Sequence, residues 1–349
     1  MTEKGLFRLF AKPSILVPRK ALLRIQKGFL HSLSMETIRP LINGISKDIH
    51  LYDLLEMESP DAVLDEVLVI LGLLSPDFEI EPVVSAFHMV RRVYAGDHPL
   101  YRACNTHYHD LRHTMDAFLA TARLVHGATL TGEDLGERRI LTALISALFH
   151  DTGHIQGKED NEGTGAKYTA NHVRRSMEFF RRHGREHGLS EEEIAEGTTM
   201  ILCTDIRVEI TASLFSSSPV ELLGRVLNAA DLLAQMADRI YLEKLLFLYH
   251  EYKEGNTGNY GSEVDLLKKT IGFYEFIEQR LSPIMDRVNA FMVSHLTARW
   301  GVSTNLYAEA IERQKEYLKK ILSIPNADPR DFLNRYGILD KVRAIHGEG

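Results

Sequence analysis

Apolar residues recur every three or four positions through most of this chain, the spacing that places them on one face of an α-helix. The clearest stretches are residues 60–74, 82–94, 191–202 and 307–321. Ser190 and Glu193 stand three residues apart at the start of the third stretch, as in the capping box that opens a helix. Strand-like alternation is scarce, and no repeat or low-complexity linker interrupts residues 40–320. The pattern therefore predicts an all-α fold, a single large multi-helix domain.

The length and composition of the chain support this organisation. Its 349 residues are 44% hydrophobic, enough to bury a large core. We divide it into an N-terminal arm (1–39), a helical body (40–325) and a C-terminal tail (326–349) with a short helix over 330–344. The longest apolar runs, around 67–74 and 141–149, fall short of the roughly 18 residues of a membrane span, and no secretory signal is visible. Cys104 and Cys203 have no paired spacing, which predicts a reducing, cytoplasmic environment.

Charge is unevenly distributed along the chain. The net charge is −7, yet residues 4–35 hold seven Lys and Arg and no acid, so the remainder carries −14. Within this basic arm the apolar and cationic residues fall on different helical faces, as in a helix that lies on an anionic membrane surface. We favour the alternative that the arm docks on the protein's own acidic surface or on another subunit, and the oligomeric state stays open. The acidic body argues against a nucleic-acid partner.

The first chemical signal is the pair His150-Asp151, which ends the apolar helical run over residues 140–149. A histidine and a carboxylate at the buried end of a helix are rare, because an unpaired buried charge costs several kcal/mol. His150 alone is explained by capping of its own helix, since the C-terminal end of the helix dipole favours a cation. Asp151 opposes that dipole, and therefore predicts a cation nearby.

Two further segments carry the same kind of signal. Asp231 is the one charged residue in the apolar stretch 226–233, where the plain alternative is a buried salt bridge to Arg225 or Arg239. His109 and His113 are four residues apart, which predicts one helix face for both. Two imidazoles and two carboxylates balance one divalent cation and suit it chemically. The predicted ligands are His113, His150, Asp151 and Asp231.

The order of these segments resembles the HD-type metal-dependent phosphohydrolases, and more narrowly the catalytic domain of the class I cyclic nucleotide phosphodiesterases. The resemblance covers about residues 105–290 and rests on five blocks in order. The blocks are Tyr108, His109, His113 and Asp116; His150, Asp151 and His154; Asn171 and His172; Cys203, Thr204 and Asp205; and Ala230, Asp231 and Leu232.

The resemblance implies two divalent metal ions and a small-molecule phosphoester substrate. His113, His150, Asp151 and Asp231 then hold the tighter ion, Zn, Fe or Mn, while Asp151 bridges to a second, mostly water-coordinated Mg or Mn. It also implies that His109 is the general acid for the leaving oxygen. His154 and Asp205 complete the catalytic set, and the implied substrate-binding residues are Tyr108, Asn171, His172, Phe273 and Phe276.

The departures from the family pattern concern specificity. Asp110 replaces an asparagine, and the glycine-rich segment 150–171 is shorter than in the animal enzymes. Phe276 matches the family's phenylalanine that stacks on a purine base. Phe273 occupies the position of the family's glutamine, which forms hydrogen bonds to that base. A phenyl ring cannot form the paired hydrogen bonds of an amide. The resemblance therefore extends to the metal centre and not to purine recognition.

Two alternative functions remain open from the sequence. HD-type sites hydrolyse phosphomonoesters with the same ligands, so a nucleotide phosphomonoesterase or a hydrolase of deoxynucleotides is the first alternative. A non-catalytic helical sensor that keeps the metal for stability is the third possibility. His109 favours the phosphodiesterase, because an alkoxide leaving group gains most from a proton donor.

Overall fold

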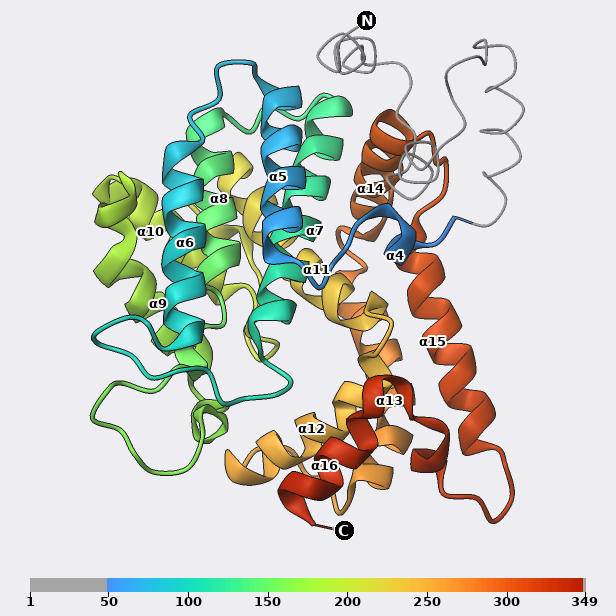
Figure 1. Ribbon diagram of the computed structural model, residues 1–349. Helices are drawn as coiled ribbons and strands as arrows, with labels where there is room; N and C mark the ends of the chain where they lie inside the picture. The colour runs from blue at the N-terminus through green and yellow to red at the C-terminus, as the bar shows by residue number, and fades with distance from the viewer. Residues whose placement is uncertain (1–48, 348–349) are drawn as a thin grey trace, which may run out of the picture.

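The protein is built from α-helices, as the computed structural model of residues 49–347 shows (Figure 1). The α-helices are α4 (Leu51–Leu54), α5 (Pro60–Leu74), α6 (Glu81–Ala95), α7 (Leu111–Leu130), α8 (Glu137–Phe149), α9 (His172–His183), α10 (Glu191–Leu202), α11 (Ser218–Ala237), α12 (Tyr241–Glu254), α13 (Glu263–Leu281), α14 (Met285–Trp300), α15 (Leu306–Leu322) and α16 (Ile338–His346). Short 3₁₀ turns are η1 (Thr152–His154), η2 (Gly165–Tyr168), η3 (Gly184–His187), η4 (Ala212–Leu214), η5 (Pro329–Phe332) and η6 (Arg335–Gly337). Residues 49–347 contain no β-strand, only one isolated bridge between Tyr101 and Gly157. The all-α prediction is confirmed.

The helical periods in the sequence locate the helices closely. Helices α5 and α10 have the predicted bounds, and α6 and α15 extend one residue beyond theirs at each end. The capping box at α10 is present: Ser190 Oγ accepts from the backbone N–H of Glu193, and the Glu193 carboxylate accepts from the backbone N–H of Ser190. Local pattern and cap chemistry therefore decide where these helices begin and end.

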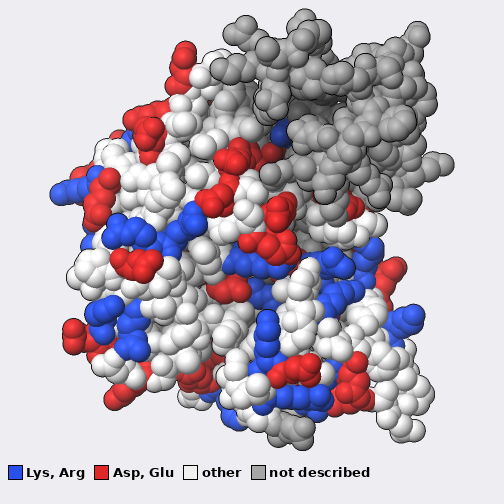
Figure 2. All heavy atoms as spheres, in the orientation of Figure 1, with Lys and Arg blue, Asp and Glu red and all other residues white. Residues whose placement is uncertain are grey.

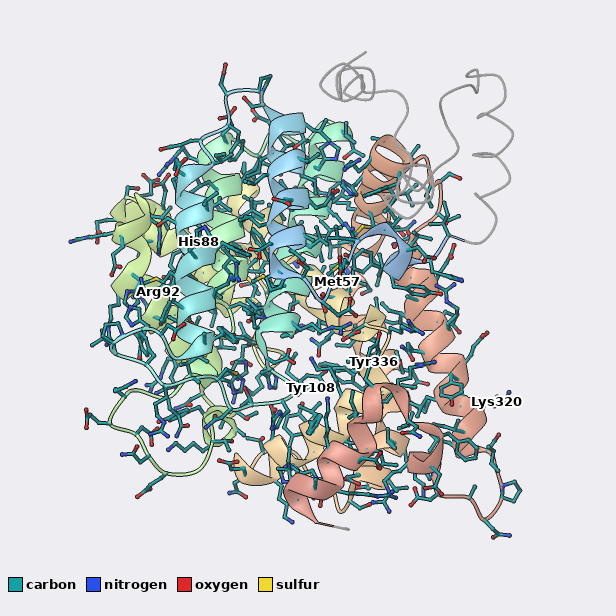
Figure 3. All side chains as sticks on the ribbon, in the orientation of Figure 1. Met57, His88, Arg92, Tyr108, Lys320 and Tyr336 are labelled. Carbon is teal, nitrogen blue, oxygen red and sulfur yellow. The ribbon has the colours of Figure 1, made fainter. Side chains whose placement is uncertain are left out.

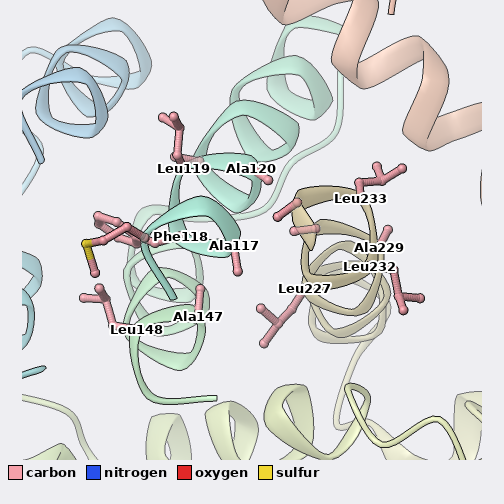
Figure 4. Packing of buried hydrophobic residues seen from close by; sticks show 14 of the residues in the cluster. Ala117, Phe118, Leu119, Ala120, Ala147, Leu148, Leu227, Ala229, Leu232 and Leu233 are labelled. Carbon is pink, nitrogen blue, oxygen red and sulfur yellow. The ribbon is translucent and has the colours of Figure 1, made fainter. Parts of the chain in front are cut away.

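Helix α7 forms the centre of the molecule and packs against α5, α8, α11 and α14. Ala117 on α7, Ala147 on α8 and Leu227 on α11 face the space between these three helices (Figure 4). Small side chains allow the helix axes to approach closely. A Cβ atom on Gly127 would lie 1.8 Å from the carbonyl oxygen of Phe291, so the crossing of α7 and α14 requires glycine there.

The C-terminal segment differs from its predicted form. The expected helix over 330–344 is replaced by η5, η6 and then α16, which begins only at Ile338. Tyr336 and Gly337 have φ values of 57° and 64°, which an α-helix does not accept, so the chain turns before α16. The segment is docked on the helical body: α16 packs against α12, and Arg330 Nη1 donates to Glu263 Oε2 at 2.8 Å.

Three further expectations concern the N-terminal arm, membrane-spanning helices and the two cysteines. The basic N-terminal arm, including residues 4–35, lies outside the described residues. Among the residues described, none of the helices combines the length and the apolar character needed to cross a bilayer. Cys104 and Cys203 are both free thiols.

Candidate metal centre

Three mutually packed helices bring the four predicted ligands together. His113 lies in the first turn of α7, His150 and Asp151 directly follow α8, and Asp231 lies in the middle of α11. All four side chains are buried, and the outermost two, His113 and Asp231, are 118 residues apart in the sequence. The packing of α7 on α8 and α11 is therefore what assembles the cluster.

The donor atoms converge on one small space. His113 Nε2 lies 3.3 Å from Asp151 Oδ2 and 3.1 Å from Asp231 Oδ1. His150 Nε2 lies 3.4 Å from Asp151 Oδ2 and 3.5 Å from Asp231 Oδ1. The two Nε2 atoms are themselves 3.3 Å apart. A cation bonded at about 2.1 Å places neighbouring donors about 3.0–3.4 Å apart, so these separations match a coordination shell.

Two local details support a cation at this position. His150 Nδ1 donates to the carbonyl oxygen of Ala147 at 2.8 Å, which leaves the lone pair of Nε2 facing the cluster. The histidine thus caps its helix and also presents a ligand atom. Asp151 Oδ2 is buried and accepts no hydrogen bond. The salt-bridge alternative for Asp231 is excluded, because its ion-pair partners are His113 and His150, while Arg225 pairs with Glu221.

Electrostatics within the cluster also favour a cation. Burial lowers the pKa of an imidazole, yet the carboxylates of Asp151 and Asp231 raise the pKa of His113 to about 9. They also raise the pKa of His150 well above its ordinary value. In return, and against the effect of burial, the imidazoles hold the pKa of Asp151 below its usual range. The two buried negative charges therefore demand either protons on the histidines or a metal ion in their place.

A second group of donors surrounds the other oxygen of Asp151. His172 Nε2 lies 3.7 Å from Asp151 Oδ1, and one ligand atom each of Asp151, His154 and His172 falls within 4.8 Å of the others. His172 Nδ1 donates to the carbonyl oxygen of Thr169 at 2.8 Å, which frees its Nε2. His154 Nε2 is buried without a partner, and burial holds the pKa of His154 well below its ordinary value. Two neutral imidazoles thus face Asp151.

Two glycines allow this second group to form. A Cβ atom on Gly153 would lie 1.9 Å from the carbonyl oxygen of His172, and one on Gly165 would lie 2.0 Å from that of His154. Arg175 clamps the same turn, with Nε donating to the carbonyl of Gly153 at 2.6 Å and Nη2 to that of Ile155 at 2.9 Å. The glycine-rich segment after His150 is therefore a close-packed part of the site.

The position of His109 differs from the sequence prediction. Helix α7 begins at Leu111, so His109 precedes the helix and does not share a helical face with His113. Asp110 is the N-cap, and its Oδ1 accepts from the backbone N–H of His113 at 3.0 Å. The capping preference of aspartate starts the helix there. The His109 ring still lies against the site, stacked on His154 with ring centroids 4.2 Å apart.

Glu251 on α12 holds His109 in place. Its Oε2 lies 2.7 Å from His109 Nδ1, and its Oε1 accepts from the backbone N–H groups of His107 and Tyr108 at 2.8 and 2.7 Å. The carboxylate is buried, so these partners compensate its charge. Sequence reasoning missed Glu251, since nothing in its helix distinguishes it from neighbouring charged residues.

Tyr108, expected to contact substrate, is buried beside the cluster, and Figure 3 labels its position. Its hydroxyl donates to Gln235 Oε1 at 2.7 Å. Gln235 Nε2 in turn approaches Asp231 Oδ1 at 3.4 Å. The tyrosine therefore contacts the metal ligands indirectly, through a glutamine that the sequence did not single out.

Asp205 and Asn171, which were also predicted to belong to the site, lie on loops beside it. Asp205 forms a bidentate ion pair with Arg207, at 2.8 and 2.7 Å, so its carboxylate is already engaged. Asn171 is the exposed N-cap of α9, immediately before His172. Arg280 Nη2 donates to the carbonyl oxygen of Asp205 at 3.0 Å and thereby ties α13 to this loop.

Phe273 and Phe276 lie on α13, one turn apart. Their ring centroids are 6.2 Å apart with nearly parallel planes, and Phe276 is 42% exposed. Within residues 49–347, neither phenyl ring stacks on the histidines of the site. The structure thus brings the two rings together and leaves Phe276 open to solvent.

Neither a scan of protein-family models nor a search of the curated proteins returned a match to this chain. The motif blocks and the geometry of these residues are therefore the features that point to a function.

Proposed function

We propose that the chain is an HD-type metal-dependent phosphohydrolase that cleaves a phosphodiester, like the class I cyclic nucleotide phosphodiesterases that its motifs resemble. The observation that carries this proposal is the convergence of the His113 and His150 Nε2 atoms, 3.3 Å apart, on oxygens of Asp151 and Asp231 that lie 3.1–3.5 Å from them. A second observation adds to it: a carboxylate-bound histidine, His109, lies next to that cluster.

His113, His150, Asp151 and Asp231 would hold the first cation. Their two negative charges and two neutral nitrogens suit Zn, Fe or Mn. Bound there, such an ion supplies Lewis-acid polarisation of a phosphoryl group and an acidified water at neutral pH. Tyr108 and Gln235 fix the orientation of Asp231, and Ala147 fixes the tautomer of His150.

His109 would give its proton to the leaving oxygen of the ester. Glu251 orients the ring through Nδ1, which leaves Nε2–H as the donor for the substrate. The stack of His109 on His154 limits rotation of the ring. Such a donor matters most when the leaving group is an alkoxide, which is why we favour a diester over a phosphomonoester.

Asp151, His154 and His172 would hold a second cation. The sequence resemblance implied an oxygen-rich second site for Mg or Mn. Two nitrogen donors beside Asp151 Oδ1 instead favour Mn, Fe or Zn over Mg, because imidazole suits transition metals. His154 and His172 are then ligands of that ion, in place of the catalytic and substrate-contact roles that the resemblance implied for them.

The resemblance assigns substrate contact to two residues of α13, Phe273 and Phe276. Phe276 offers an exposed ring on which a base or another flat group can stack. Phe273 beside it offers no amide for a base edge, so the recognition of any base rests on stacking.

Metal analysis combined with a substrate panel tests the proposal. Protein purified without chelator should contain at least one equivalent of transition metal and should hydrolyse a cyclic nucleotide or another alkyl phosphodiester. Asp231→Asn should lose metal and activity together. Asp286→Asn, an exposed aspartate at the start of α14, is the matched control and should retain both.

The same panel separates the alternatives. It contains cyclic mononucleotides, cyclic dinucleotides, nucleoside monophosphates and deoxynucleoside triphosphates, each assayed with Mn²⁺. Hydrolysis of the monoesters or triphosphates alone would replace the diester assignment with a nucleotide phosphatase. Bound metal with no turnover on any member would make the protein a metal-stabilised sensor and refute the proposal.

A further inference from the structure

A cavity of about 770 Å³ lies apart from the candidate metal centre. Its walls come from residues 50–58, α7, α11, α15 and η6, and none of the four first-cation ligands lines it. Figure 3 labels two lining residues, Met57 before α5 and Tyr336 before α16. Basic and acidic side chains gather on this part of the face in Figure 2.

Arg123 on α7 lines this cavity and carries unused hydrogen-bond donors. The residue is 1% exposed, and Nη1 donates to the Tyr307 hydroxyl at 2.9 Å. Nε and Nη2 are buried without any partner. These two nitrogens form one edge of the guanidinium, the edge that matches a carboxylate or phosphate in a bidentate arrangement.

Among the other arginines that line the cavity, Arg112 also has one buried donor without a hydrogen-bond partner, its Nε, but its Nη2 is already paired. Arg112 Nη2 pairs with Asp238 Oδ1 at 2.9 Å, and Arg313 pairs with Glu309 at 3.5 Å. Arg239 is exposed and lies over the Tyr52 ring, 5.1 Å from its centroid. An exposed guanidinium is solvated, whereas a buried one with unused donors is costly to the fold. Arg123 is therefore the position at which an anion would contribute most.

We propose that this cavity binds a small organic anion, with the Nε–Nη2 edge of Arg123 holding its carboxylate or phosphate group. The volume exceeds that of an inorganic ion and suits a drug-sized molecule. Tyr52, Tyr307 and Tyr336 line the cavity and offer apolar ring surface to the body of the ligand. The inference does not depend on the proposed hydrolase activity.

Calorimetric titration of the full-length, metal-loaded protein tests the proposal with two anions, benzoate and phenylphosphonate. Benzamide is the neutral analogue of the same size. We expect saturable binding of at least one anion and no binding of benzamide at the same concentrations. Arg123→Met should weaken anion binding by about tenfold or more, because the bidentate ionic contact is lost. Arg174→Gln, an exposed arginine of α9, should leave it unchanged.

Two further variants test whether the anion binds in this cavity and whether its binding needs the candidate metal centre. Ala310→Trp, on the α15 wall, should fill the cavity and block binding without altering Arg123, which decides the matter if Arg123→Met does not fold. Asp231→Asn should keep anion binding, since the metal centre is not involved. Failure of both anions to bind, equal affinity for benzamide, or binding lost in Asp231→Asn but kept in Arg123→Met would each overturn the proposal.

Discussion

Replacing Glu251 with glutamine tests how His109 acts. Glu251 Oε1 accepts from two backbone N–H groups at 2.8 and 2.7 Å, and a glutamine keeps both bonds only if its oxygen stays there. Its NH₂ group must then face His109 Nδ1, where the carboxylate oxygen lies 2.7 Å away in the native protein. Nδ1 then accepts a hydrogen bond from that NH₂ group, and the ring stays in place.

The expected loss follows from the bond that is removed. A hydrogen bond to a charged group contributes about 1.5–3 kcal/mol, which corresponds to about a 10–150-fold change in rate. Glu251→Gln should therefore lower kcat/KM by that factor on an alkyl diester such as adenosine 3′,5′-cyclic monophosphate. A p-nitrophenyl phosphodiester leaves without a proton, and its rate should change less than about threefold.

The assay compares both substrates for the wild type, Glu251→Gln and a control. Glu178→Gln on α9 serves as the control, because its carboxylate is exposed and pairs only with Arg174. Unfolding temperatures should agree among the three proteins, since both backbone hydrogen bonds are kept. Equal losses on the two substrates, or no loss on either, would refute the role of Glu251 in proton donation by His109.

Three other predictions concern stability, packing and specificity. His126 and His295 are buried, with their Nδ1 atoms 3.0 Å apart. Burial and the charge of Arg299 lower the pKa of His126 to about 4. Burial, helped by Arg123, His126 and Arg299, lowers the pKa of His295 as well. Below pH 6.5 these histidines take up protons in the unfolded chain but stay neutral in the folded protein. The free energy of unfolding should therefore fall between pH 6.5 and pH 4, by up to about 1.4 kcal/mol per pH unit for each histidine. Urea unfolding at pH 7, 6 and 5 should show a shallower fall for His295→Gln, and identical slopes would contradict this. Gly153→Ala should lower the free energy of unfolding by about 1–3 kcal/mol, because the added Cβ overpacks against His172. Gly157→Ala, which has open space around its Cβ, should lower it less, and equal losses for the two variants would contradict the close approach at Gly153. The wild-type kcat/KM values for cyclic AMP and cyclic GMP should differ by less than about tenfold, because stacking barely distinguishes bases. Phe273→Gln should increase this difference, whereas a strong preference of the wild type for one purine would show that Phe273 does not shape the pocket.

Much of the metal centre was visible in the sequence because its residues break local patterns. His150, Asp151 and Asp231 are polar positions inside apolar helical stretches, and a buried charge must have a partner. Arg123 shows the same signal, as the one fully charged residue in the stretch 117–128. The cavity that it lines could therefore have been suspected from the pattern, although its walls could not.

Other residues of the site lacked any such signal. Glu251 belongs to a charged stretch of α12 and acquires its role only because α12 passes beside residues 107–109. Gln235 bridges Tyr108 and Asp231 in the same way. His109 was placed on a helix by its spacing, yet the cap formed by Asp110 starts α7 after it. Cap geometry and contacts between distant segments are not encoded in the period of apolar residues.

By itself, the sequence determined the helical architecture and the bounds of several helices, and it singled out the four buried residues that the fold brings together as candidate ligands of a cation. These features follow from local periodicity and from the cost of burying charge, which act along a single segment. The tertiary structure alone decided that His154 and His172 lie beside Asp151, that Glu251 holds His109 and that Arg123 lines a separate cavity. Those relations depend on how α7, α8, α11, α12 and α15 pack, and long-range packing brings together side chains that no local pattern connects.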